Sequence, residues 1–145
     1  MATQEQEILH ELQDKMVERA ENLVRNLKLN KGEGVEKGKT QASKALEVAQ
    51  SAGSLAVFIN WLRYQVGREA SALFWTKPAG QHSLAKALTA ELNWLQGEVV
   101  GKMATSPKPE QQHVTMRAAT RFLGYFRRAL VCADYLNEIT LEKGG

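Results

Sequence analysis

The 145-residue sequence has one cysteine, three prolines and no long apolar run. A single cysteine, Cys132, excludes an internal disulfide and a cysteine-based zinc cluster, and we expect it to be a small apolar core residue in a reducing compartment. So few prolines leave room for long helices. No segment approaches the roughly 20 apolar residues that a membrane span needs, and the first residues do not resemble a signal peptide. We therefore expect a cytoplasmic protein with no membrane partner.

Alternating polar and apolar residues of the kind that form strands are also missing. Apolar residues recur instead at three- and four-residue spacing, which is the periodicity of amphipathic helices. The sequence therefore predicts an all-α fold, a bundle of about five to six helices that forms a single domain over residues 1–145. Thr3 and Ser54 are expected N-caps. The expected helices cover residues 3–29, 40–52, 55–74, 84–101 and 110–141.

The stretch GEGVEKGKT, residues 32–40, ends in Gly-Lys-Thr, as a phosphate-binding P-loop does. A P-loop has the spacing G-x-x-x-x-G-K-[ST] and follows a buried strand. Here Glu33 occupies the position of the first glycine, and the preceding residues have the pattern of a helix. The stretch therefore predicts a flexible linker. A nucleotide-dependent enzyme is the least favoured alternative, and loss of an ATPase activity in Lys39→Ala would support it.

Residues for metal or covalent chemistry are sparse. His10, His82 and His113 are widely separated, and none has a histidine or cysteine partner at helical spacing, so we expect surface residues and no metal site. No G-x-S-x-G motif is present, and no base is indicated beside Cys132. Metal binding and nucleophilic catalysis are therefore unsupported by the residues, and we expect no cofactor and no small-molecule substrate.

The formal net charge of +3 is unevenly distributed along the chain. Residues 1–30 hold six acids and four Lys or Arg, whereas residues 111–133 hold four arginines and no acid. Arg117, Arg121 and Arg128 are four and seven residues apart, so they project from one side of a helix about 6 Å and 10 Å apart. Guanidinium groups at such spacings can bind successive phosphates of a nucleic acid. The alternative is that these arginines pair with the acidic first helix.

The third expected helix has two different sides. One side carries Trp61, Tyr64 and Arg68, which we treat as a candidate partner interface. These side chains contact a partner protein or a stacked base, or the helix is packed on both sides within the bundle. The opposite, apolar side consists of Leu55, Phe58, Ile59, Leu62, Val66 and Leu73.

Two segments, AGSLAVFINWL (52–62) and MRAATRFLGYFRRALVCADYL (116–136), resemble the small all-helical subunit of CRISPR RNA-guided effector complexes. The resemblance is closest to type III-B (Cmr) complexes. The first segment is similar to that family's glycine followed by a Leu-Ala-x-Phe helix, and the second to its Arg-Ala-x-x-x-hydrophobic last helix. Residues 74–103 depart from the family pattern, so the related small subunits of type I complexes stay open.

The resemblance implies a non-catalytic subunit in antiviral defence. Such a subunit stacks with copies of itself and other subunits along a filament that carries crRNA, and contacts the backbone of the target or displaced strand, RNA or DNA. An alternative is a helical protein-interaction module without nucleic-acid binding, anchored by Trp61, Tyr64 and Trp94. The implied nucleic-acid contacts are Arg63, Arg117, Arg121, Arg127 and Arg128, with Lys39 and Lys44 as weaker additions.

Overall fold

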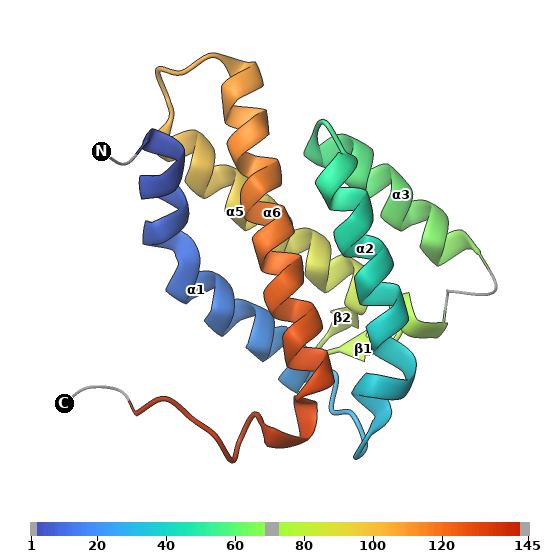
Figure 1. Cartoon of the computed structure of the whole chain (residues 1–145). Helices are drawn as coiled ribbons and strands as arrows, with labels where there is room; N and C mark the ends of the chain where they lie inside the picture. The colour runs from blue at the N-terminus through green and yellow to red at the C-terminus, as the bar shows by residue number, and fades with distance from the viewer. Residues whose placement is uncertain (1–2, 69–72, 143–145) are drawn as a thin grey trace.

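The computed structural model describes residues 3–68 and 73–142. It is an all-α bundle, as the periodicity of the sequence predicts (Figure 1). Two short strands, β1 (Pro78–Ala79) and β2 (His82–Ser83), form a small antiparallel hairpin that the sequence did not predict. The helices are α1 (Gln4–Asn26), the π-helical turn η1 (Gly34–Gly38), α2 (Lys39–Ser51), α3 (Leu55–Gly67), α5 (Leu84–Lys102), α6 (Lys108–Val131) and the 3-10 turn η2 (Ala133–Tyr135).

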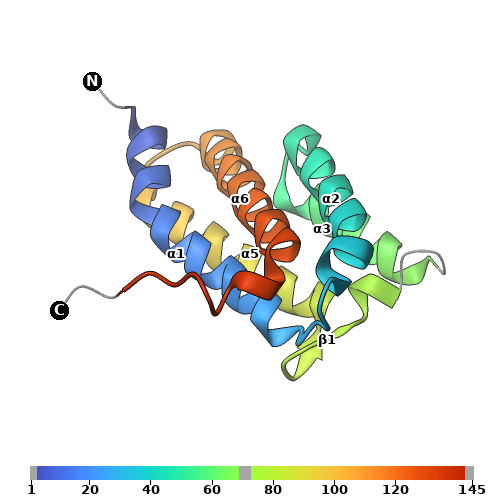
Figure 2. The ribbon, with the colours of Figure 1, turned by 60° about the horizontal axis from the view of Figure 1, so that its bottom comes forward.

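Helix α6 is the centre of the bundle. It packs against α1 on one side and α2 on the other, while α5 lies behind it in the view of Figure 1. Helix α3 follows α2 and packs against both α2 and α5. Figure 2 shows the same arrangement from a second direction, with α1 and α2 on opposite sides of α6. Within residues 3–68 and 73–142, one side of α6 is therefore left without a neighbouring helix.

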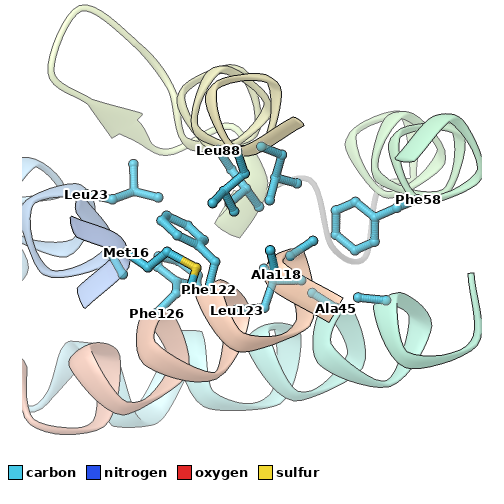
Figure 3. Close-up of a cluster of buried hydrophobic side chains, with 14 of the residues drawn as sticks. Met16, Leu23, Ala45, Phe58, Leu88, Ala118, Phe122, Leu123 and Phe126 are labelled. Atoms are coloured by element: carbon cyan, nitrogen blue, oxygen red, sulfur yellow. The ribbon is translucent and has the colours of Figure 1, made fainter. Parts of the chain in front are cut away.

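The core forms where α1, α2, α3 and α5 meet the buried side of α6 (Figure 3). Phe122 and Phe126 of α6 are fully buried and point toward Met16 of α1 and Leu88 of α5. Burial of one such side chain stabilises the fold by about 1.5–3 kcal/mol. Helix α2 faces α6 with small buried residues, which let the two backbones approach closely. These small residues are Ala42, Ala45 and Ala49.

Side-chain caps set where the helices begin. Thr3 and Gln6 form a capping box at the start of α1, and the Ser54 hydroxyl accepts a hydrogen bond from the Val57 N–H at the start of α3. Both N-caps predicted from the sequence are confirmed. Ser83, which caps α5 through the Lys86 N–H, is a third cap of the same kind. At the other end of α5, the Glu11 carboxylate of α1 raises the pKa of Lys102.

Two of the predicted helix ends are wrong. Helix α3 ends at Gly67 instead of residue 74, because Arg68 is already extended; residues 69–72 of the expected helix lie outside the described residues. Leu73, expected on the apolar side of that helix, is 87% exposed. Helix α6 ends at Val131 instead of residue 141. Tertiary contacts divert the chain there, since the Asp134 carboxylate accepts from the Gly32 N–H and the Leu136 carbonyl accepts from Arg25.

The expected linker at residues 32–40 is also helical instead. Residues 34–38 form the π-helical turn η1, which continues directly into α2. Its glycines allow close packing against α6: a Cβ added at Gly34 would lie 2.3 Å from the Leu130 carbonyl oxygen. The Glu36 N–H donates to the Gly32 carbonyl. Gly34 therefore allows η1 to pack closely against α6. The backbone of residues 34–38 is helical and does not form the open loop that surrounds a phosphate in a P-loop.

Among the described residues, no helix is long and apolar enough to cross a bilayer. Cys132, expected in the core, is exposed, and its Sγ donates to the Arg128 carbonyl at 3.0 Å. Cys132 follows the exposed Arg128 by four residues, so its side chain lies on the exposed side of α6 and not in the buried stripe. The three histidines are exposed, as predicted.

Candidate nucleic-acid interface

The side of α6 without a neighbouring helix carries three exposed arginines, Arg117, Arg121 and Arg128, which we call the arginine sector. Their position follows from the buried residues of α6, such as Phe122 and Phe126, because the 100° step per residue places the three arginines away from that stripe. The sector therefore lies on the side of α6 away from its buried stripe, between the flanking helices α1 and α2. The predicted grouping of these three residues agrees with the structure.

Arg117 is engaged by the acidic first helix. Its Nε lies 3.3 Å from Glu5 Oε1 of α1, and His113 Nε2 lies 3.3 Å from the same oxygen. These are ion-pair distances, although neither N–H is aimed well enough to make a hydrogen bond to that oxygen. Pairing of the arginines with the acidic first helix, the alternative noted above, therefore holds for Arg117.

Arg121 and Arg128 differ from Arg117. Both are exposed, and within residues 3–68 and 73–142 no carboxylate lies within ion-pair distance of either guanidinium group. Arg128 lies over the Tyr125 ring, 6.0 Å from its centroid, which holds the guanidinium group close to the helix. A Cβ at Gly124 would meet no atom within 4 Å, so the surface between the two arginines is open. These two positive charges are available to a ligand.

Arg127 and Lys39 lie along the border between α6 and α2. The Arg127 Nε donates to the Ser43 hydroxyl of α2 at 2.7 Å, so this partly buried arginine also links the two helices. Lys39 is exposed one turn before Ser43, on the same edge of α2. Lys44 is exposed too, but it projects from the side of α2 opposite Ala42 and Ala45. Of the two lysines, only Lys39 borders the arginine sector.

Arg63 lies elsewhere in the molecule. It lines a groove between α3 and the first turn of α5, together with Lys86. Helix α5 covers the buried side of α6, so this groove opens on a different face from the arginine sector. The structure therefore does not bring Arg63 together with the arginines of α6.

The candidate partner interface on α3 is divided. Tyr64 is 62% exposed, and the Arg68 guanidinium lies over its ring at 5.6 Å. Trp61 is half-buried instead, with its ring 5.6 Å from Phe58 and 6.1 Å from Trp75. Of the two alternatives for this helix, packing within the bundle therefore holds for Trp61, which lies against the fully buried Trp75. Trp94 is half-buried as well, stacked against Arg19 of α1 at 4.0 Å.

A hollow of about 270 Å³ lies between α2 and α6, at the end of the arginine sector that carries Arg117. Gln50, Arg117 and Thr120 line it together with His113. Sequence reasoning missed Gln50 and Thr120, because a polar residue on a helix gives no sign that it will face a second helix. In the part of the chain that the structure describes, no three His, Cys, Asp or Glu side chains are grouped closely enough to hold a metal ion.

No family model, curated protein or solved structure matches the chain.

Proposed function

We propose that the chain binds the phosphate backbone of a nucleic acid through the arginine sector, as the non-catalytic small subunit of a CRISPR crRNA-guided effector complex. The observation that carries the proposal is the pair Arg121 and Arg128, two exposed guanidinium groups on one side of α6 with no carboxylate beside them among the described residues. The resemblance of residues 52–62 and 116–136 to such subunits supports it further.

The chemistry of binding follows from the side chains. A guanidinium group donates two parallel hydrogen bonds to a phosphate and keeps its charge at every physiological pH. The surface that carries Arg121 and Arg128 is a helix side flanked by two other helices, without a projecting element that enters a groove. Contacts of this kind position a strand and do not read its sequence. The target or displaced strand therefore crosses α6, and Arg127 and Lys39 extend the positive edge toward α2.

The test is the affinity for a fluorescein-labelled single-stranded RNA, measured by fluorescence anisotropy. We expect Arg121→Ala/Arg128→Ala to weaken binding by about tenfold or more, because the loss of even one charge-assisted contact costs about 1.5–3 kcal/mol and about 1.4 kcal/mol corresponds to tenfold. Lys15→Ala/Lys86→Ala is the matched control for two lost positive charges, since Lys15 on α1 and Lys86 on α5 are exposed outside the arginine sector. Equal affinities of the double variant and the wild type would rule out the arginine sector as the binding surface.

A second candidate is a protein-interaction module without nucleic-acid binding, which the exposed Tyr64 and Arg68 favour. Exposed aromatic and arginine side chains are common anchors of protein interfaces. A tagged pull-down from the native host in about 100 mM salt separates the two functions. Under the proposed function, wild type recovers large subunits with short guide RNAs, and Arg121→Ala/Arg128→Ala loses the RNA. Under the second, proteins are recovered without RNA, and only Tyr64→Ala loses them.

A further inference from the structure

The groove that contains Arg63 has an apolar floor and a positive rim. It encloses about 310 Å³ between α3 and the first turns of α5. Arg63 and Lys86 are exposed at its rim, and none of its lining residues is acidic. The N-cap Ser83 places the positive end of the α5 dipole at the same rim. The floor is formed by Ile59, Leu62, Val66 and Ala85. Such a surface fits an extended segment that carries apolar side chains flanked by carboxylates.

A segment with that chemistry is present in the chain itself. Residues 137–142, NEITLE, follow the last helical turn: the Glu138 and Ile139 N–H groups donate to the Tyr135 carbonyl, and residues 140–142 have no regular secondary structure. Ile139 is 80% exposed and Leu141 is 92% exposed, so both apolar side chains are free to become buried against another surface. If residues 139–142 extend on docking, Ile139 and Leu141, two apart, project from the same side, so both can enter one groove. Glu138 and Glu142 flank them with two negative charges that match the two cations at the rim.

The segment cannot reach the groove of its own chain. It leaves the bundle beside α1, whereas α3 lies on the opposite side of the molecule, beyond α6 and α2, in both Figure 1 and Figure 2. Six extended residues span only about 20 Å. The Arg25 side chain also binds the Leu136 carbonyl and Asn137, which holds the start of the segment at α1. A groove of a second molecule is the one that it can enter.

We propose that residues 137–142 of one copy dock in the α3–α5 groove of a second copy, with Ile139 and Leu141 on the apolar floor and Glu138 and Glu142 beside Arg63 and Lys86. The contact joins two different surfaces, so each copy keeps one free groove and one free segment, and association is head-to-tail. This deepens, and so rests on, the part of the proposed function in which copies of the chain associate. Its test uses no nucleic acid, so the two proposals can fail separately.

The test is sedimentation velocity of the purified chain up to about 1 mM, because an interface this small binds weakly. The wild type is expected to grow beyond a dimer as its concentration rises. Arg63→Glu/Lys86→Glu, which alters the groove, and Ile139→Ser/Leu141→Ser, which alters the segment, are each expected to weaken association about tenfold or more. All four positions are exposed, so both variants should fold, and circular dichroism checks that they do.

Mixing the two variants gives the decisive result. The groove variant retains its segment and the segment variant retains its groove, so an equimolar mixture is expected to form a 1:1 dimer that grows no further. Adding Glu138→Lys/Glu142→Lys to the groove variant should restore association by reversing both charge pairs. A wild type that stays monomeric at every concentration would overturn the proposal and leave the groove to another occupant. Self-association that neither variant weakens would overturn it as well.

Discussion

Arg117 and Arg121 are one helical turn apart on α6 and differ in what lies beside them. Arg117 faces the start of α1 and lies at ion-pair distance from Glu5, whereas Arg121 has no carboxylate beside it among the described residues. An arginine paired within the fold must lose that contact before it can bind a phosphate, and an unpaired one binds at no such cost. At the scale of single residues, neighbouring helices therefore decide which arginines are available.

Glycines provide a prediction at the same scale. Gly34→Ala is expected to destabilise the fold by about 1–3 kcal/mol, because the new methyl group would lie against the Leu130 carbonyl and force η1 away from α6. Gly97→Ala is the matched control. Gly97 lies within α5, where a Cβ would meet nothing within 4 Å, so this change should stabilise by about 0.5–1 kcal/mol. Urea unfolding followed by circular dichroism measures both; a destabilisation as large in Gly97→Ala would contradict the packing role of Gly34.

At the scale of elements, α3 has three different surfaces. Phe58 and Leu62 face the core, Ile59 and Arg63 face the groove beside α5, and Tyr64 with Arg68 faces outward. The helix is short and carries no acidic residue, so its polar groups are amide, phenol and cationic side chains. One side of α3 therefore packs in the core, and two other sides, the groove side and the outward side, are each able to contact a ligand.

The two aromatic residues of α3 are expected to respond differently to substitution. Trp61→Ala should destabilise the fold by about 2 kcal/mol or more, because its ring fills the space between Phe58 and Trp75. Tyr64→Ala should change stability by less than about 0.5 kcal/mol, since most of its side chain is exposed. Thermal unfolding measures both variants. A stability loss in Tyr64→Ala that equals that of Trp61→Ala would show that the tyrosine side chain is packed in solution.

At the scale of the whole molecule, charge is separated between surfaces. The exposed side of α1 is rich in acids, whereas α6 is free of acids from residue 111 to its end. The arginine sector of α6 therefore lies next to the acidic helix α1. This arrangement directs a polyanion onto α6 and away from α1, and it strengthens at low ionic strength.

The salt dependence of RNA binding tests this separation. With about three or four phosphates neutralised, the slope of log affinity against log salt should be about −2 to −3 for single-stranded RNA. Arg121→Ala/Arg128→Ala should bring the slope closer to zero by about 1.4, because each phosphate contact contributes about 0.7. Arg68→Ala is the control. Arg68 lies at the C-terminal end of α3, outside the arginine sector, so this change should leave the slope of log affinity against log salt unchanged. A slope near zero in the wild type would mean that phosphates are not the ligand.

Much of the fold could be predicted because helix periodicity is a local property. The stripe Leu84, Leu88, Leu92, Leu95 and Val99 identified α5, and every one of these residues is buried. Helix ends were less predictable where distant residues set them. The end of α6 depends on Asp134 binding Gly32, and the shape of residues 34–38 depends on close contact with Leu130. Both contacts join residues far apart in the sequence, so neither can be predicted from the spacing of apolar residues around it.

The sequence by itself determined the all-α class, the N-caps at Thr3 and Ser54, and the alignment of Arg117, Arg121 and Arg128 on one side of a helix. All of these depend on residues within a few turns of one another. Only the tertiary structure decided that Glu5 engages Arg117 and leaves Arg121 and Arg128 open, that Trp61 packs against Trp75, and that Arg63 joins Lys86 in a separate groove. The physical reason is that pairing and burial depend on which helices meet, and that meeting is set by the packing of the whole core.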